Sequence, residues 1–326
     1  MELVRGLVNL SERHKNCVLT IGNFDGVHIG HQFVLDKLKQ VAEQHGVPCA
    51  VMLFEPQPQE VFLKEKAAAR VLTFREKYKK LKQMGVDRLI CVRFCSKFAA
   101  MSAEDFVEKL LVEKLGVRHL IVGDDFRFGK KRAGDFALLQ AEAKKLGFSV
   151  DDSQTFKYSN KRASSTEVRA YLGAGDFEHA AELLGAPFEF QGKVIHGDKN
   201  GRKFGFPTAN IAVKRKVLPI KGVFGVEACL AEACYQGVAN IGNKPTLQGI
   251  KPVLEVHLFD FEQQIYGQRL SIRPLFKIRD EQKFASVDEL IAQIADDVAS
   301  AKRQFLNGEQ AFGSPHVEET ETIDHE

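Results

Sequence analysis

The sequence predicts two domains: an α/β domain built on a parallel sheet, followed by an all-β domain. Up to about residue 184, apolar runs alternate with stretches of helical spacing. The pattern changes at Gly185-Ala186-Pro187, after which glycine-punctuated runs rich in Val, Ile and Phe follow. Strands separated by helices are typical of βαβ units, whereas consecutive strands pair antiparallel in a small barrel or sandwich. The 326 residues are enough for each domain to bury its own core.

In the first domain we expect buried strands joined by amphipathic helices. The helix beginning at Ser102 has Glu104 and Asp105 in its first turn, where the helix dipole favours acidic side chains. Strands are expected at residues 18–21, 47–54, 89–92, 119–122 and 148–150, and helices over about residues 33–41, 75–84, 102–115, 135–146, 166–172 and 176–184.

In the second domain we expect strands and one closing helix. A capping box predicts the helix start, because Ser286 and Glu289 can each satisfy an open backbone N–H. The sequence after about residue 307 is polar and acidic, which favours disorder. Strands are expected at residues 190–195, 223–230, 236–241, 253–259 and 270–278, and the domain boundaries at 1–186, 187–307 and 308–326.

Composition and charge are those of a soluble globular protein. The net charge is +3 and the basic residues are scattered, so we expect neither a nucleic-acid nor a membrane partner. No segment has the roughly 20 apolar residues of a membrane span, and the N-terminus lacks an apolar signal region. The six cysteines lie mostly in apolar runs without zinc-site spacing, which favours reduced cysteines in a cytoplasmic protein. Self-association is left open.

The segment from Thr20 to His31 carries the first chemical constellation. It follows a buried strand and opens a helix, whose unpaired N–H groups and positive dipole end make a phosphate site. His28 and His31 can both point at one phosphate and stabilise charge that develops there. A lone histidine here would be more simply a turn residue, but Gly22, Gly26 and Gly30 would also let a triphosphate approach the backbone. The chain has no GxxxxGK[ST] loop and no GxGxxG fingerprint.

Three further stretches are expected at the same edge of the parallel sheet, where open α/β folds bind ligands. They are residues 54–58, 123–129 and 162–169. Ser165 and Thr166 can cap a helix and turn hydroxyl and N–H groups toward an anion. Arg162 and Arg169 offer fork-shaped donors to phosphates. Plain helix capping and surface charge are the simpler alternatives for these four residues.

The second constellation lies at the start of the all-β domain. Gly197, Gly201 and Gly205 recur four apart with basic residues between them, which indicates a loop that can close over phosphates. Thr208 and Asn210 lie two apart in an extended segment, so their neutral oxygens share one face and suit Mg²⁺.

The alternating segment Leu254–Asp260 places a carboxylate near that loop. Glu255 and His257 share one face of the expected strand, opposite Leu254, Val256 and Leu258. Glu255 is a candidate general base for an alcohol. His257 is more simply a hydrogen-bonded strand residue.

The first half resembles the FMN adenylyltransferase module of bacterial bifunctional riboflavin kinase/FAD synthetases, on an HxGH-type Rossmann-like nucleotidyltransferase fold. The resemblance rests on His28-x-Gly30-His31 and the three stretches above. It implies that His28 and His31 stabilise the transferring adenylyl phosphate. Leu53 and Gln57 depart from the pattern, where Thr and His are common. The expected nucleotide- or phosphate-binding residues are Gly22, Phe24, Asp25, Gly30, Asp125, Arg162, Ser165, Thr166 and Arg169.

The second half resembles the riboflavin kinase family, which has a six-stranded antiparallel Greek-key barrel with a C-terminal helix. The resemblance rests on residues 205–210, 237–242 and 254–257. It implies that Thr208 and Asn210 bind Mg²⁺ and ATP phosphates, and that Glu255 activates the ribityl 5′-hydroxyl. Arg279 matches an arginine near the active site, with a solvated turn as its alternative. The expected phosphate-binding residues here are Gly197, Lys199, Gly201, Gly205, Pro207, Thr208 and Asn210.

Together the halves predict an enzyme that phosphorylates riboflavin to FMN and then adenylylates FMN to FAD, using ATP and Mg²⁺. An enzyme with one working half and a non-catalytic flavin-binding protein are the rivals. Both would be favoured by loss of the histidine pair or of Glu255, and all three residues are present. Nucleic-acid recognition would require a basic face and a further domain that the sequence lacks.

Overall fold

The computed structural model describes residues 1–123, 125–153, 157–158, 161–197, 200–246 and 249–309. The chain forms two compact units. The first contains Met1–Gln191, Val213–Ile220 and Lys244–Pro252; the second contains Gly192–Ala212, Lys221–Asn243 and the chain from Val253. The segment Val213–Ile220 thus lies between two barrel strands in the sequence but packs with the first unit.

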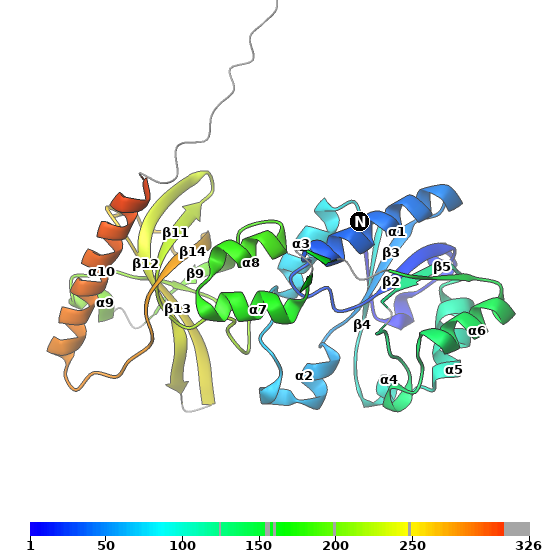
Figure 1. Cartoon of the computed structure of the whole chain (residues 1–326). Coiled ribbons are helices and arrows are strands. Elements are labelled where there is room, and N and C mark those ends of the chain that lie inside the picture. Colours follow the sequence, from blue (N-terminus) through cyan, green and yellow to red (C-terminus); the bar gives the residue numbers. More distant parts are fainter. Residues whose placement is uncertain (124, 154–156, 159–160, 198–199, 247–248, 310–326) are drawn as a thin grey trace, which may run out of the picture. The chain divides into compact units, whose positions relative to one another are not determined.

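A six-stranded parallel sheet forms the centre of the first unit (Figure 1). The five expected strands are confirmed, and β1 is an additional edge strand too short to show a pattern. From β2 the chain builds outward through β3 and β4, then crosses to β5 on the other side, so the topological switch point lies between β2 and β5. The strands are β1 Glu2–Arg5, β2 Cys17–Ile21, β3 Cys49–Phe54, β4 Arg88–Val92, β5 Val117–Val122 and β6 Ser149–Asp152, in the order β1-β4-β3-β2-β5-β6.

Helices connect these strands much as expected. Ser102 caps its helix by accepting a hydrogen bond from the N–H of Asp105 at 3.0 Å. That helix begins as α5 and continues as a π-helix over Phe106–Lys114. The helices are α1 Ile29–His45, α2 Pro58–Phe62, α3 Phe74–Gln83, α4 Ser96–Ala99, α5 Ala103–Asp105, α6 Phe136–Leu146, α7 Ser165–Ala174 and α8 Phe177–Leu184; β7 Lys157–Tyr158 and β8 Lys161–Arg162 pair antiparallel in a separate two-stranded sheet.

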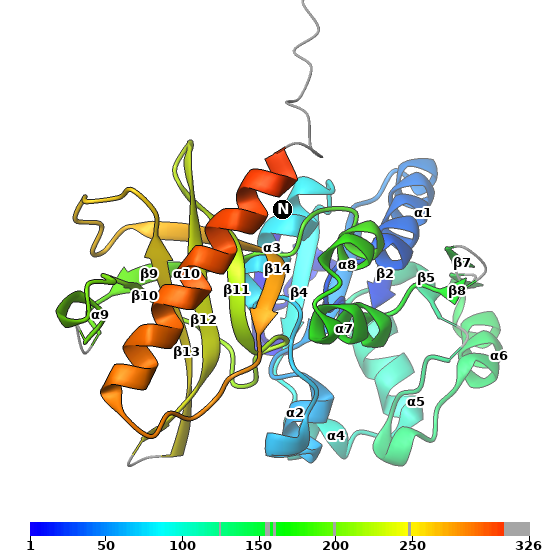
Figure 2. The same ribbon diagram turned by 60° about the vertical axis from the view of Figure 1, so that its left-hand side comes forward.

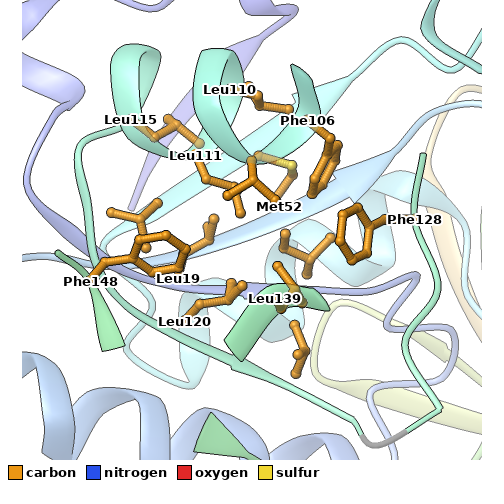
Figure 3. Packing of buried hydrophobic residues seen from close by; sticks show 14 of the residues in the cluster. Leu19, Met52, Phe106, Leu110, Leu111, Leu115, Leu120, Phe128, Leu139 and Phe148 are labelled. Atoms are coloured by element: carbon orange, nitrogen blue, oxygen red, sulfur yellow. The ribbon is translucent and has the colours of Figure 1, made fainter. Parts of the chain in front are cut away.

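The sheet has a hydrophobic core on each face, because alternate strand residues point to opposite sides. Leu19 and Leu120 belong to a cluster with Leu110 and Phe148, shown in Figure 3. Val18, one residue before Leu19, belongs instead to the cluster that includes Leu35 and Leu38 of α1. Because both faces of the sheet are covered, β2 is buried along its whole length and is apolar except for Thr20.

The second unit is a closed barrel, so the sandwich alternative is excluded and the six-stranded barrel is confirmed. β10 was not expected, since it has only three residues. α10 runs alongside the barrel (Figure 2) and buries Ala301 and Phe305 with Val223, Val238 and Phe259. The strands are β9 Phe190–Ile195, β10 Ala209–Ile211, β11 Gly222–Leu230, β12 Ala233–Thr246, β13 Gly249–Leu258 and β14 Arg269–Arg279, in the order β10-β13-β12-β11-β14-β9; the helices are α9 Asn200–Lys203 and α10 Val287–Glu309. The tail expected to be disordered lies, from residue 310, outside the described residues.

The expectation that all cysteines are reduced is wrong for one pair. Cys229 and Cys234 form a disulfide, because they lie directly opposite each other in the β11–β12 hairpin, with Cα atoms 4.0 Å apart. The other four cysteines are free. Burial raises the pKa of the Cys17 and Cys49 thiols to about 11, so both are neutral at physiological pH.

Candidate active sites

The loop Gly22–His28 leaves the carboxyl end of β2 at the switch point and leads into α1. Its backbone is unusual, because Phe24 and Val27 have φ of 47° and 46° and Gly26 has 89°. A left-handed conformation is costly for a β-branched residue such as Val27 and persists only where surrounding contacts enforce it. Such strained backbone is common at ligand-binding sites.

Asp25 supplies several of the contacts that enforce this loop. Its carboxylate is 4% exposed and accepts hydrogen bonds from the N–H groups of Val71 at 3.1 Å and Leu72 at 3.2 Å. Arg169 of α7 donates to the same carboxylate at 3.0 Å. Ser165, also on α7, donates its hydroxyl to the Asp25 carbonyl oxygen at 2.7 Å. The structure therefore brings Asp25, Ser165 and Arg169 together, and these polar groups hold the loop.

His28 and His31 lie at the start of α1, with their rings stacked at a centroid distance of 3.7 Å. His28 is the N-cap residue and is buried. The ring of Phe24 packs against His31, with centroids 4.8 Å apart. A Cβ on Gly30 would lie 3.3 Å from the His28 ring, which explains glycine between the two histidines. The predicted pairing of the two imidazoles is thus seen at a helix N-terminus, where an anion is stabilised.

His31 is held neutral by its surroundings. Burial, and then the electrostatic effects of His28 and Lys77, lower the pKa of His31 well below its ordinary value. Its Nδ1 is buried without a hydrogen-bond partner among the described residues. A neutral imidazole keeps one N–H donor, which can be directed at a phosphate oxygen.

The start of α7 differs in detail from the prediction. Ser164, rather than Ser165 or Thr166, caps the helix by accepting from the Glu167 N–H at 3.2 Å. The cap position requires extended backbone, and Ser164 is the last residue to have it. Thr166 is exposed, and its hydroxyl accepts a hydrogen bond from Arg169 at 3.3 Å. The side chain of Arg162 lies outside the described residues.

The strand next to β2 ends in the second predicted stretch. In the parallel register Thr20 lies opposite Ile121, so the chains after β2 and β5 leave the sheet side by side. Asp125 is exposed, and one carboxylate oxygen lies 2.9 Å from where a Cβ on Gly123 would stand. Glycine at 123 therefore allows the Asp125 carboxylate to fold back over the end of β5.

An aromatic pocket of about 400 Å³ opens beyond the carboxyl ends of β3 and β4. The prediction did not include it, although the signal was present as phenylalanines just after successive strands. The Phe54 and Phe94 rings meet edge to face with centroids 5.7 Å apart. Such a slot suits a planar aromatic ligand. It is lined by Phe54, Phe62, Phe94, Phe98, Phe106, Phe126 and Phe128, with Arg127, Lys131 and Arg132 among its polar residues.

The loop between β3 and α2, which joins the pocket residues Phe54 and Pro58, is held by ion pairs. Arg70 donates to both oxygens of Glu55, at 2.8 and 2.9 Å, and also pairs with Glu60. Gln57 is fully buried as the N-cap of α2, and Leu53 is fully buried in β3. The two positions that depart from the family pattern are thus interior residues.

In the barrel, the expected metal ligand and the expected base come together. Asn210 of β10 and Glu255 of β13 are direct partners in the antiparallel register, so their side chains share one face. Leu254 and Val256 are buried on the opposite face, as the alternation predicted. His257 donates its Nδ1–H to the Pro207 carbonyl oxygen at 2.9 Å, which confirms the simpler interpretation of this histidine.

The predicted phosphate loop folds onto these residues. A Cβ on Gly197 would lie 2.4 Å from the Asn210 amide, and one on Gly201 would lie 2.4 Å from the Phe206 carbonyl oxygen and 3.2 Å from the Thr208 hydroxyl. Both glycines are therefore required by close approach. Gly205 needs glycine for its φ of 84°. Lys199 lies outside the described residues.

Arg279 has a structural partner. Its guanidinium donates to both carboxylate oxygens of the buried Asp297, with two contacts of 2.8 Å, which ties α10 to the end of β14. It also donates to the Asp280 carbonyl oxygen at 3.0 Å, so it is not simply a solvated turn residue. Its contact with flavin stays a prediction.

The fold and the two groups of residues define a class: a two-unit transferase with an HxGH-type nucleotidyltransferase sheet and a flavokinase-like barrel. A family model described as FAD synthetase matches residues 10–167, and one described as riboflavin kinase matches residues 184–305. The chain belongs to the bifunctional riboflavin kinase/FMN adenylyltransferase family.

Relatives with that name match nearly end to end. The chain is 50% identical to the bifunctional riboflavin kinase/FMN adenylyltransferase of Escherichia coli K12, covering 94% of this chain and 98% of the relative. It is 48% identical to that of Haemophilus influenzae, covering 94% and 99%. A crystal structure from Streptococcus pneumoniae described as a macrolide-efflux protein has a TM-score of 0.76 at 29% identity, covering 93% of this chain and 99% of that one. Among the described residues, no helix combines the length and apolarity needed to cross a bilayer.

Proposed function

We propose that this protein makes both flavin coenzymes, phosphorylating riboflavin to FMN in residues 187–307 and adenylylating FMN to FAD in residues 1–186. One observation carries the proposal: the chain gathers two separate sets of reactive residues, His28 with His31 at the switch point of the sheet and Asn210 with Glu255 on the barrel. The family membership of nearly the whole chain supports both activities.

In the first unit, a phosphate oxygen of FMN would attack the α-phosphorus of ATP, forming one P–O bond while pyrophosphate leaves. His28 and His31 would donate hydrogen bonds to the α-phosphate and stabilise its developing charge. The aromatic pocket would take the flavin ring, and Arg127, Lys131 and Arg132, which also line the pocket, would contact its phosphate. The residues proposed to hold nucleotide or phosphate remain Gly22, Phe24, Asp25, Gly30, Asp125, Arg162, Ser165, Thr166 and Arg169.

In the barrel, Glu255 would remove the proton of the ribityl 5′-hydroxyl as its oxygen attacks the γ-phosphorus of ATP and ADP leaves. Thr208 and Asn210 would hold Mg²⁺, which neutralises triphosphate charge when bound. The fit is supported by the close approach of Gly197 and Gly201 to these two side chains. Lys199, Gly205 and Pro207 would complete the phosphate loop, and Arg279 would act on the flavin side.

Purified protein incubated with riboflavin, ATP and Mg²⁺ tests the proposal, with products followed by chromatography. We expect FMN first and FAD after it. Added FMN with ATP should give FAD and pyrophosphate without riboflavin. An enzyme with one working half would form only one of the products, and a flavin-binding protein would form neither. A cytoplasmic location and the absence of a nucleic-acid partner stay predictions from composition.

A further inference from the structure

Lys77 of α3 is a buried cation that the proposed chemistry does not use. Its side chain is 1% exposed, although lysine is almost never fully buried unless it is paired. Its ammonium donates a hydrogen bond to the carbonyl oxygen of Asn23, in the strained loop between β2 and α1. This bond crosses 54 residues of sequence and joins a helix to the loop that carries the histidines.

Lys77 interacts electrostatically with charged groups around the loop Gly22–His28 and with His31. Burial lowers its pKa, while the negative charge of Asp25 opposes that shift more strongly than any other charge. Arg70 lowers the pKa of Lys77 further, and Glu55 and Glu60 raise it. Lys77 in turn is, after His28, the charge that lowers the pKa of His31. The ammonium is therefore within electrostatic reach of both the Asp25 carboxylate and His31.

α3 presents Lys77 from a fixed position. Its N-terminus is closed by a capping box, in which the Glu76 carboxylate accepts from the Thr73 N–H at 2.7 Å and the Thr73 hydroxyl accepts from the Glu76 N–H at 3.4 Å. Glu76 is also held by Arg215 at 2.8 Å. A group on a helix anchored in this way is placed more precisely than one on a loop.

We infer that Lys77 is a positioning residue for adenylyl transfer: its ammonium holds the Asn23 carbonyl, keeps the loop in its left-handed conformation and fixes His31 toward the nucleotide. The inference rests on the proposed function of the first unit. In a trans peptide the N–H points away from the carbonyl, so the Asn23 carbonyl turned toward Lys77 directs the N–H of Phe24 to the opposite side, where it can donate to a phosphate. The charge of Lys77 also adds to the effects of burial and of His28 in lowering the pKa of His31, which favours the neutral imidazole with a single N–H.

Three substitutions separate these two effects. Lys77→Met removes the hydrogen bond and the charge, Lys77→Gln keeps a donor for the Asn23 carbonyl without charge, and Lys77→Arg keeps both. Lys80→Met is the matched control, because Lys80 lies on the same helix and donates to the Leu184 carbonyl oxygen rather than to the loop. Riboflavin phosphorylation in each full-length variant is the internal control for an intact barrel, and chemical denaturation checks that the first unit, which contains Lys77, is folded.

For Lys77→Met we expect kcat/KM for FAD formation from FMN to fall about 10- to 100-fold, the value of a hydrogen bond to a charged group, with kinase activity unchanged. Lys77→Arg should retain most of the wild-type kcat/KM for FAD formation. Removal of a neighbouring positive charge raises the pKa of His31, so in Lys77→Gln the acidic limb of the kcat/KM profile should move to higher pH. Histidine NMR titration of the free protein should show the same upward shift for the resonance that His31→Ala removes.

Several results would overturn the inference. A loss in Lys77→Met equal to that in Lys80→Met, or a His31 titration unchanged in Lys77→Gln, would leave Lys77 as a packing residue only. If Lys77→Met does not fold, the Gln and Arg variants still decide, since Gln must shift the pH profile and Arg must not. The wild-type protein is assayed for FAD formation from FMN and ATP before any variant is compared. If it forms no FAD, the proposed function of the first unit is refuted instead of the role of Lys77.

Discussion

The two units place their reactive side chains by different means. In the first unit, His28 and His31 depend on a strained loop held by distant residues such as Asp25, Lys77 and Arg169. In the barrel, Asn210 and Glu255 meet because adjacent strands place them opposite each other. A site set by strand register depends on backbone pairing, whereas a site set by a loop depends on every contact that restrains it. The first site should therefore be the more sensitive to substitutions far from the chemistry.

The largest expected effect separates the two chemistries completely. Glu255→Gln should lower riboflavin phosphorylation by about 100-fold or more, the usual contribution of a general base, and leave FMN adenylylation intact. His28→Ala with His31→Ala should do the reverse. Chromatography of products from riboflavin and from added FMN measures both. Loss of both activities in one folded variant would refute two independent sites.

The next effect tests whether the loop Gly22–His28 depends on the buried carboxylate of Asp25. Asp25→Ala leaves Arg169 and two backbone N–H groups without their acceptor, which should cost about 3–5 kcal/mol in the free energy of unfolding. FAD formation should fall with it, while FMN formation persists. Asp36→Ala is the matched control, because its ion pair with Lys39 is on the surface of α1. Equal losses of stability and of FAD formation in Asp25→Ala and Asp36→Ala would show that the loop Gly22–His28 does not depend on Asp25.

A smaller effect is expected from Arg215, which packs with the first unit although its neighbours in sequence are barrel strands. It is 5% exposed and donates to the Val71 carbonyl oxygen at 3.0 Å and to Glu76 at 2.8 Å. Arg215→Met should lower the stability of the first unit by about 3 kcal/mol, because Glu76 loses its buried partner. Chemical denaturation measures it, with the exposed Arg118→Met as control. Equal free energies of unfolding for Arg215→Met and Arg118→Met would contradict this prediction.

The smallest effect should come from the hairpin disulfide in the barrel. Cys229→Ser with Cys234→Ser removes a cross-link between residues only five positions apart, so we expect a loss of about 2 kcal/mol or less in the free energy of unfolding. Kinase activity should be unchanged, because Asn210 and Glu255 belong to other strands. Reducing agent should have the same effect on the wild type and none on the variant. A large loss of kinase activity would show that this hairpin, too, supports the site.

The sequence alone was enough to predict the alternation of strands and helices, the change of pattern near residue 186, and the two constellations around His28 and Glu255. Periodicity, caps and glycine turns are local signals, so they are readable without neighbours. The prediction from the sequence missed β1 and β10, which are too short to show an alternation of apolar and polar residues.

Only the tertiary structure decided which residues support the sites and which could act in them. The aromatic pocket unites phenylalanines from segments that follow β3, β4 and β5, and Lys77 reaches a loop 54 residues away. The Cys229–Cys234 disulfide likewise depends on strand pairing that places two cysteines directly opposite each other. Contacts between distant segments depend on the packing of the whole unit, and no local pattern of residues encodes them.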